Sequence, residues 1–224
     1  MTTFVLIPGA GGAAWYWHRV VPRLREAGHE AIAVDLPGDD RAAGLARYAE
    51  LVATAARGHD DVTLVAQSLG GFTAPLVCER VAVRRLVLVN AMIPRPGEKA
   101  GEWWGNTGCA EAQREAAERG GYSPTFDVAT YFLHDVPAET LAGGESKQRA
   151  EVETVFREAC RFDAWPEVPT HVVAARDDRF FPVGFQERIA RERLDRAVEV
   201  IPGGHLVALS NPDGLTERLL SDLA

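Results

Sequence analysis

The chain has 224 residues, of which 46% are hydrophobic and 25% charged, so it is too apolar for a disordered protein and matches a globular domain. Its formal net charge of −8 disfavours nucleic acid or an anionic membrane surface as the main partner, because both need a basic face. A chain of this length buries enough core to fold without disulfides or a structural metal.

The cysteines are odd in number and widely spaced, at Cys78, Cys109 and Cys160. No C-x-x-C motif and no His/Cys cluster with zinc spacing accompanies them, so we expect free thiols, no metal and no cofactor. No stretch approaches the roughly 20 apolar residues that span a bilayer, and the first residues lack a basic segment followed by a long apolar run. We therefore expect a soluble cytoplasmic protein, a monomer or homodimer. Its partner is a small-molecule substrate, with no nucleic acid and no membrane involved.

Short β-branched apolar runs alternate along the chain with longer amphipathic stretches. The first half predicts strands and helices in turn over Phe4–Ile7, Trp15–Ala27, Ala31–Asp35, Leu45–Arg57, Val62–Ala66, Leu69–Arg80 and Arg85–Asn90. The alternation resumes later with His171–Ala175, Val183–Leu194, Val198–Ile201 and Gly214–Leu220. Near-continuous Val, Ile and Leu runs are typical of parallel strands covered on both faces. The pattern predicts an α/β fold with an open, doubly wound, mainly parallel sheet of six strands.

The interval between Asn90 and Pro169 contains no convincing strand. It has two helical stretches, Ala110–Arg119 and Lys147–Cys160, and several aromatic residues. A loop this long inside a compact domain is usually functional, and its aromatic side chains must be buried against something. We expect residues 93–167 to form a small helical cap insertion, with the core in residues 1–92 and 168–224. A long surface excursion is the alternative.

Ser68 stands where a strand runs directly into a helix, between the small residues Ala66 and Gly70. Such a turn holds the serine in a strained backbone conformation with its hydroxyl pushed outward. The helix directs its positive end at Ser68, and the N–H of Leu69 becomes available to a developing oxyanion. The alternative is an ordinary turn in which Ser68 caps the helix.

An acidic pair and a histidine follow the last two strands. Asp177 or Asp178 suits the carboxylate that orients a catalytic histidine, and the other is then a turn or cap residue. Of the six histidines, His205 is the one that follows both a strand and a Gly-Gly pair. The order serine, aspartate, histidine is the one expected for a nucleophile elbow with its acid and base on later loops.

A glycine-rich run, Pro8-Gly9-Ala10-Gly11-Gly12, follows the first strand. Glycines let the backbone approach a ligand closely, and the N–H of Ala10 is placed to be a second oxyanion donor. The rival interpretation is a phosphate or dinucleotide loop. It lacks the G-x-G-x-x-G spacing and the Lys-Ser/Thr of a P-loop.

Together these features resemble the α/β-hydrolase superfamily over essentially the whole chain. The run Phe4–Ala10 with Trp15 and Trp17, followed by Ala33–Gly38, resembles the branch that holds plant methylesterases, hydroxynitrile lyases and small esterases. The resemblance implies that Ser68 is the nucleophile, His205 the general base and Asp178 the acid, with Asp177 as the fallback. It also implies that the insertion is a cap that roofs the substrate pocket.

Some positions depart from this family's pattern. Pro8 replaces the usual histidine after the first strand, and Ala66 replaces the first glycine of the elbow. Leu206 and Gly9 stand where the lyases carry a lysine and a threonine, which favours ester hydrolysis over cyanohydrin cleavage.

The sequence thus predicts a serine hydrolase acting on a small ester through an acyl-enzyme. The candidate substrate-binding residues are Gly9, Trp103, Trp104, Phe132 and Leu206. Two alternatives remain open. One is a lyase, cyclase or acyltransferase that uses the same three residues, and the other is a binding protein without catalysis.

Overall fold

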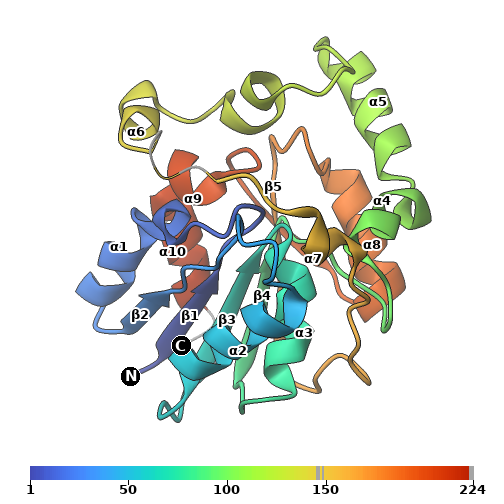
Figure 1. Ribbon diagram of the computed structural model, residues 1–224. Coiled ribbons are helices and arrows are strands. Elements are labelled where there is room, and N and C mark those ends of the chain that lie inside the picture. Colours follow the sequence, from blue (N-terminus) through green and yellow to red (C-terminus); the bar gives the residue numbers. More distant parts are fainter. Residues whose placement is uncertain (145–146, 148, 222–224) are drawn as a thin grey trace.

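A parallel sheet runs through the middle of the molecule (Figure 1). The computed structural model describes residues 1–144, 147 and 149–221. Within these residues six strands pair in the order β2-β1-β3-β4-β5-β6, and every pair is parallel. The strands are β1 (Thr3–Ile7), β2 (Glu30–Ala33), β3 (Val62–Gln67), β4 (Arg85–Val89), β5 (Thr170–Ala175) and β6 (Val198–Ile201). The predicted six-stranded α/β fold is confirmed, and the sheet is wholly parallel.

Both faces of the sheet are buried, which explains why its central strands are apolar at consecutive positions. Val5 and Ile7 of β1 point into one hydrophobic cluster, whereas Phe4 and Leu6 point into a second cluster on the opposite face. All four of these side chains are fully buried. A strand with two buried faces has no polar side to alternate with, so it appears in the sequence as a continuous apolar run.

Helices form a layer on each side of the sheet (Figure 1). One face packs against α2 (Leu45–Ala56), α3 (Gly70–Cys78) and α8 (Val183–Leu194). The other face packs against the short 3₁₀ helix η1 (Ala14–Trp17), α1 (Val20–Glu26), α9 (Val207–Ser210) and α10 (Pro212–Ser221). The carboxyl ends of the strands therefore meet at one edge of the sheet, between two helical layers.

The helix expected over Trp15–Ala27 is interrupted, because it divides into η1 and α1. Pro22 has no N–H to donate to the carbonyl of His18, which favours the start of a new helix over a continuous one. Pro22 lies in the first turn of α1, where the missing N–H has no helical partner in any case. The helix expected over Gly214–Leu220 begins earlier, with Pro212 as its first residue.

The described part of the segment between β4 and β5 (residues 90–169) consists of short helices joined by irregular chain. It contains α4 (Ala100–Thr107), α5 (Cys109–Gly120), a π-helical turn η2 (Ala129–Leu133), α6 (Ala138–Ala142) and α7 (Glu153–Arg157). In Figure 1, α5, α6 and the chain between them lie across the top of the molecule. The helix expected over Lys147–Cys160 is wrong for most of its length, since α7 is the only α-helix among the described residues of this range and residue 148 lies outside them.

Residues 149–158, which we term the strap, run instead along the loops that follow β1 and β2. Backbone and side-chain hydrogen bonds fasten the strap to these loops, so its polar groups find partners outside a helix. The contacts join Arg149 to Asp35 and Gly11, Glu151 to Gly11 and Tyr48, Val152 to Gly38, Thr154 to Arg41 and Glu158 to Leu45.

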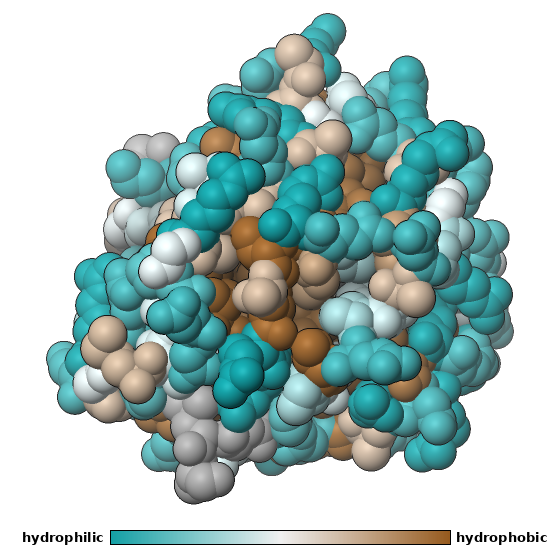
Figure 2. All heavy atoms as spheres, turned by 90° about the horizontal axis from the view of Figure 1, so that it is seen from below, coloured by the Kyte–Doolittle hydropathy of each residue, from teal (hydrophilic) through white to brown (hydrophobic). Residues whose placement is uncertain are grey.

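Seen from below, the molecule is mostly hydrophilic, with some hydrophobic residues gathered near the centre of this face (Figure 2). No helix in the described ranges has the length and apolar character needed to cross a membrane.

Candidate active site

Ser68 occupies a strained turn between β3 and α3. Its backbone φ is 50°, in the left-handed region that residues other than glycine seldom adopt. A Cβ atom at Gly70 would lie 2.8 Å from the carbonyl oxygen of Pro8, so glycine allows α3 to pass this close to the loop after β1. The turn thereby places the Ser68 side chain at the carboxyl end of the sheet.

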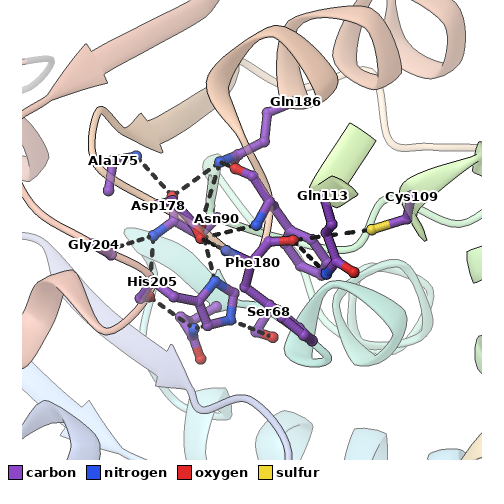
Figure 3. Close-up of polar contacts among 12 residues, drawn as sticks. Ser68, Asn90, Cys109, Gln113, Ala175, Asp178, Phe180, Gln186, Gly204 and His205 are labelled. Carbon is purple, nitrogen blue, oxygen red and sulfur yellow. Dashed lines mark hydrogen bonds and ion pairs between the residues drawn. The ribbon is translucent and has the colours of Figure 1, made fainter. Parts of the chain in front are cut away.

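His205 reaches Ser68 from the loop after β6, and Asp178 reaches His205 from the loop after β5 (Figure 3). The distance from His205 Nε2 to Ser68 Oγ is 3.1 Å, and that from His205 Nδ1 to Asp178 Oδ2 is 2.9 Å. Ser68, Asp178 and His205 are 8%, 4% and 1% exposed. Three residues that are far apart in sequence thus form one buried chain of hydrogen bonds.

The loop after β5 gives its two aspartates different partners. Asp178 Oδ1 accepts the backbone N–H groups of Phe180 (2.8 Å) and Phe181 (2.9 Å), which leaves Oδ2 for the imidazole. Asp177 instead bonds the guanidinium of Arg176, and this contact holds the pKa of Asp177 below its usual range. The carboxylate that meets His205 is therefore that of Asp178.

Aromatic rings enclose the imidazole of His205. Phe132 of η2 stacks on it with ring centroids 5.0 Å apart and an interplanar angle of 20°. Phe180 and Phe181 meet its edges at centroid distances of 5.0 and 5.1 Å. These rings keep water away from the imidazole, which strengthens its electrostatic contact with Asp178.

A cavity of about 330 Å³ lies beside Ser68 and His205. Gly9, Phe132 and Leu206 line it, as do Ala10 and Gln67. Much of the remaining wall is apolar and comes from η1, α6, α9 and the chain around η2, namely Trp15, Val128, Leu133, Leu141 and Leu209. Lys147, Arg149 and Glu151 give the cavity one charged side.

Trp103 and Trp104 do not line this cavity, contrary to the expectation from sequence. Trp103 is fully buried, and its Nε1 donates to the carbonyl of Ile93 at 3.1 Å. Both indoles pack against Phe181, and Trp104 also meets Phe180. The two tryptophans therefore attach α4 to the core, behind the phenylalanines that contact His205.

Two backbone N–H groups near Ser68 have no acceptor among the described residues, those of Ala10 and Leu69. Leu69 directly precedes α3, and Ala10 is an exposed residue of the cavity wall. Gly9 lies close to Ser68 and leaves no space for a side chain. A Cβ atom at Gly9 would lie 2.4 Å from Gln67 Oε1 and 2.9 Å from Ser68 Cβ. The arrangement can offer two N–H donors to an oxygen atom bound at Ser68.

The model of the alpha/beta hydrolase family matches residues 4–218, which is nearly the whole chain. The chain belongs to the alpha/beta hydrolase family. The position of Ser68 at a strand-to-helix turn, with Asp178 and His205 on later loops, follows the order described for this fold.

Several curated proteins similar to this chain are named as esterases. The chain is 37% identical to "Probable esterase PIR7A" of Oryza sativa subsp. indica over 111 residues, which cover 44% of this chain and 42% of that protein. It is 34% identical to "Methyl jasmonate esterase 1" of Vitis vinifera over 105 residues, which cover 42% and 40%. The matched stretches thus span less than half of these curated relatives.

A solved hydrolase structure shows the same fold. The pyrethroid hydrolase from Sphingobium faniae JZ-2 superimposes with a TM-score of 0.78 and 22% sequence identity, over 99% of this chain and 97% of that one. At this level of identity the likeness concerns the fold.

The hydrolase site also contains polar residues that the sequence did not single out. Asn90 and Gln186 lie behind Asp178, and Gln67 Nε2 is 3.4 Å from His205 Nε2. Burial raises the pKa of the Tyr16 phenol, which lines the cavity. Asn90 had a detectable signal, since it is the polar residue at the carboxyl end of an apolar strand. Gln186, in the middle of α8, had none.

The cysteines are free thiols and offer no competing nucleophile. Burial raises the pKa values of Cys78 and Cys160 to about 12, so both thiols are protonated at neutral pH. No group of three or more His, Cys, Asp or Glu residues with metal-binding geometry occurs in the described part of this hydrolase.

Proposed function

We propose that the protein is a serine hydrolase that cleaves small carboxylic esters through Ser68, His205 and Asp178. The observation that carries this proposal is the continuous chain of contacts from Ser68 Oγ through the imidazole to Asp178, at 3.1 and 2.9 Å. Membership of the alpha/beta hydrolase family and the esterase names of its relatives support ester hydrolysis as the reaction.

Acylation begins when His205 Nε2 takes the hydroxyl proton of Ser68 and Oγ attacks the acyl carbon of the ester. The carbonyl oxygen becomes an oxyanion, which accepts hydrogen bonds from the N–H groups of Ala10 and Leu69. Each such donor is worth about 3 kcal/mol of transition-state stabilisation. The intermediate collapses as its bond to the alcohol oxygen breaks, and His205 returns the proton to the departing alcohol.

Deacylation repeats these steps with water as the nucleophile. His205 removes a proton from water, the resulting hydroxide attacks the acyl carbon, and the Ser68 oxygen leaves with the proton that His205 gives back. Asp178 holds the imidazole in the tautomer with its proton on Nδ1 and stabilises the imidazolium in both halves of the reaction.

The substrate is a compact ester bound in the cavity beside Ser68. A volume of about 330 Å³ is at the lower end of the range for ligand pockets, and the apolar wall favours an apolar acyl or alcohol group. Residues 93–167 act as the cap in this proposal, because Val128, Phe132, Leu133 and Leu141 supply much of that wall.

The protein works as a monomer or homodimer without a cofactor. Its three free cysteines fit the reducing cytoplasm.

Labelling with a fluorophosphonate, followed by a panel of p-nitrophenyl esters of increasing acyl length, tests the proposal. We expect wild-type protein to be labelled at Ser68 and to hydrolyse the short esters. Ser68→Ala should lose labelling and at least about 10⁴-fold in kcat, with its thermal unfolding little changed. Retention of most esterase activity by Ser68→Ala would contradict the assignment.

The same experiment separates the alternatives. A protein that is labelled at Ser68 but hydrolyses no ester in the panel uses the three residues for a lyase, cyclase or acyltransferase reaction. A folded protein that is neither labelled nor active is a binding protein with a silent site.

A further inference from the structure

Asn90 directly follows β4, and Ser68 directly follows the neighbouring strand β3. It is fully buried, and its backbone φ is 44°, in the left-handed region. Asparagine is one of the few non-glycine residues that tolerate this region. Because the backbone N–H of Asn90 is bonded to Val173 O (2.9 Å), the residue is fixed against β5 and its side chain has a defined direction.

The Asn90 amide uses all of its hydrogen-bonding capacity on the loop that carries His205, the end of β5 and α8 (Figure 3). Its Nδ2 donates to the carbonyl oxygens of Gly204 (3.2 Å) and His205 (3.1 Å). Its Oδ1 accepts the backbone N–H of Ala175 (2.7 Å) and the amide of Gln186 (3.3 Å). An amide with two donors and two acceptor positions is thereby fully satisfied.

Gln186 extends this network to the acid. Its side chain is 4% exposed, and its Nε2 donates to Phe181 O (2.6 Å) while lying 3.5 Å from Asp178 Oδ2. Phe181 is also the residue whose N–H binds Asp178 Oδ1. The Asn90–Gln186 pair therefore touches the backbone on both sides of the Asp178–His205 contact.

We propose that Asn90 is a positioning residue that holds the His205 backbone at a fixed distance from the Asp178 loop, so that the imidazole reaches Ser68 and Asp178 together. This inference rests on the proposed function. The loop before His205 contains Gly203 and Gly204 and is held by two further bonds, from Asp177 N to Gly203 O (2.8 Å) and from Gly204 N to Asp135 Oδ2 (2.5 Å). The amide of Asn90 adds the bond that reaches the carbonyl oxygen of His205 itself, at 3.1 Å.

The chemistry of the Asn90 site requires an amide and not merely its shape. A carboxylate of the same size would lose both donors and would face the carbonyl oxygens of Gly204 and His205. Glycine would keep the left-handed backbone and remove the side chain. Asn90→Asp and Asn90→Gly therefore both remove the hydrogen bonds that the amide donates, while the left-handed backbone can be kept.

The test compares kcat, KM and the rate of fluorophosphonate labelling for wild-type protein, Asn90→Gly, Asn90→Asp and the control Asp195→Gly, all at a temperature where each is folded. Asp195 has φ 52° at the exposed end of α8, so Asp195→Gly makes the same kind of backbone change away from the site. We expect both Asn90 variants to lose about 10- to 100-fold in kcat and in labelling rate with KM changed less than threefold. Asp195→Gly should match wild type.

A purely structural role for Asn90 would lower the unfolding temperature and leave kcat of the folded variants at the wild-type value, which would overturn the inference. Should Asn90→Gly not fold, Asn90→Asp decides by the same criteria. If wild-type protein is not labelled at all, the proposed function fails. If it is labelled and the Asn90 variants equal it in kcat and labelling rate, this inference alone fails.

Discussion

Two residues other than glycine adopt left-handed backbone at the candidate active site. Among the described residues other than glycine, Ser68, Asn90 and Asp195 have a positive φ, and the first two end neighbouring strands beside His205. Such conformations are unfavourable and persist where the surroundings over-determine them. Here the buried sheet and the hydrogen bonds to the neighbouring loops provide that constraint. The backbones of Ser68 and Asn90 therefore direct both side chains toward the loop that carries His205.

Adding a single Cβ atom at Gly9 should impair catalysis. Gly9→Ala would bring that atom to 2.4 Å from Gln67 Oε1 and 2.9 Å from Ser68 Cβ, so the loop that carries Ala10 must move. Since this displacement withdraws an oxyanion donor, we expect kcat/KM for a short ester to fall by about 100-fold. Steady-state kinetics of the purified variant measure the effect.

Gly184→Ala in α8 is the matched control for Gly9→Ala. No atom lies within 4 Å of the Cβ that it introduces, and its position is helical. It should leave kcat/KM unchanged and raise the free energy of unfolding by up to about 1 kcal/mol. Wild-type activity in Gly9→Ala would show that the Gly9–Ala10 loop has no part in the reaction.

The residues of the candidate site differ in how far the sequence could predict them. Ser68 and His205 lie in local patterns, a strand-to-helix turn and a strand followed by two glycines, and those patterns determine their placement. The local pattern alone left both Asp177 and Asp178 open, and the family resemblance favoured Asp178. The local pattern could not decide, because the choice depends on which carboxylate caps the N–H groups of Phe180 and Phe181. Asn90 acts through contacts with distant loops, which no local pattern records.

At the scale of elements, α2 depends on the strap for its first turn. Its N-cap residue, Gly44, has no side chain to accept a hydrogen bond. Glu158, a residue of the strap, caps the helix instead, because its carboxylate accepts the N–H of Leu45 at 2.7 Å. A carboxylate at this end also interacts favourably with the helix dipole. The strap and α2 therefore stabilise each other.

Glu158→Ala should destabilise the protein by about 1 kcal/mol, because it removes both the cap and the favourable charge. Urea unfolding at neutral pH measures this change. The control is Glu153→Ala, whose exposed carboxylate pairs with Arg157 one turn along α7 and should matter by less than about 0.5 kcal/mol. Equal effects of the two substitutions would contradict the capping role of Glu158.

The strap is a part of the fold whose secondary structure could not be predicted from the sequence. Strands buried on both faces were predictable, because their apolar runs follow from the burial itself. The helical pattern of Lys147–Cys160 gave way to hydrogen bonds with the loops after β1 and β2, such as that from Val152 N to Gly38 O (2.8 Å). Helix propensity is a weak preference, and tertiary contacts of this kind override it.

At the scale of the whole molecule, a buried ion pair joins the start of the β4–β5 segment to α8. The side chains of Glu98 and Arg193 are 5% and 2% exposed, and their groups form two contacts. Arg193 also donates to the carbonyl of Ile93, and Glu98 accepts from Asn106. These bonds fix the first turn of the segment to the same helix that carries Gln186 toward Asp178.

The Glu98–Arg193 pair predicts a pH dependence of stability. Burial tends to raise the pKa of Glu98, but the hydrogen bonds from Arg193 and Asn106 outweigh it and hold the pKa below its ordinary value of 4.5. A carboxyl whose pKa is lowered by folding contributes stability that is complete above its ordinary pKa and is lost as the pH falls through the folded-state value. The contribution of Glu98 is therefore complete at pH 7 and declines below pH 4.5.

Glu98→Gln should cost about 3 kcal/mol at pH 7, because it leaves the Arg193 charge buried without a counter-charge. The difference in unfolding free energy between wild type and variant should narrow as the pH falls below 4.5, since wild-type Glu98 then becomes protonated and also leaves Arg193 unpaired. Urea unfolding of both proteins across this range measures the difference. Glu102→Gln is the control, because Glu102 pairs with Lys99 at the surface nearby. A difference that stayed constant with pH would mean that Glu98 stabilises this junction by its shape and hydrogen bonds, with no contribution from its charge.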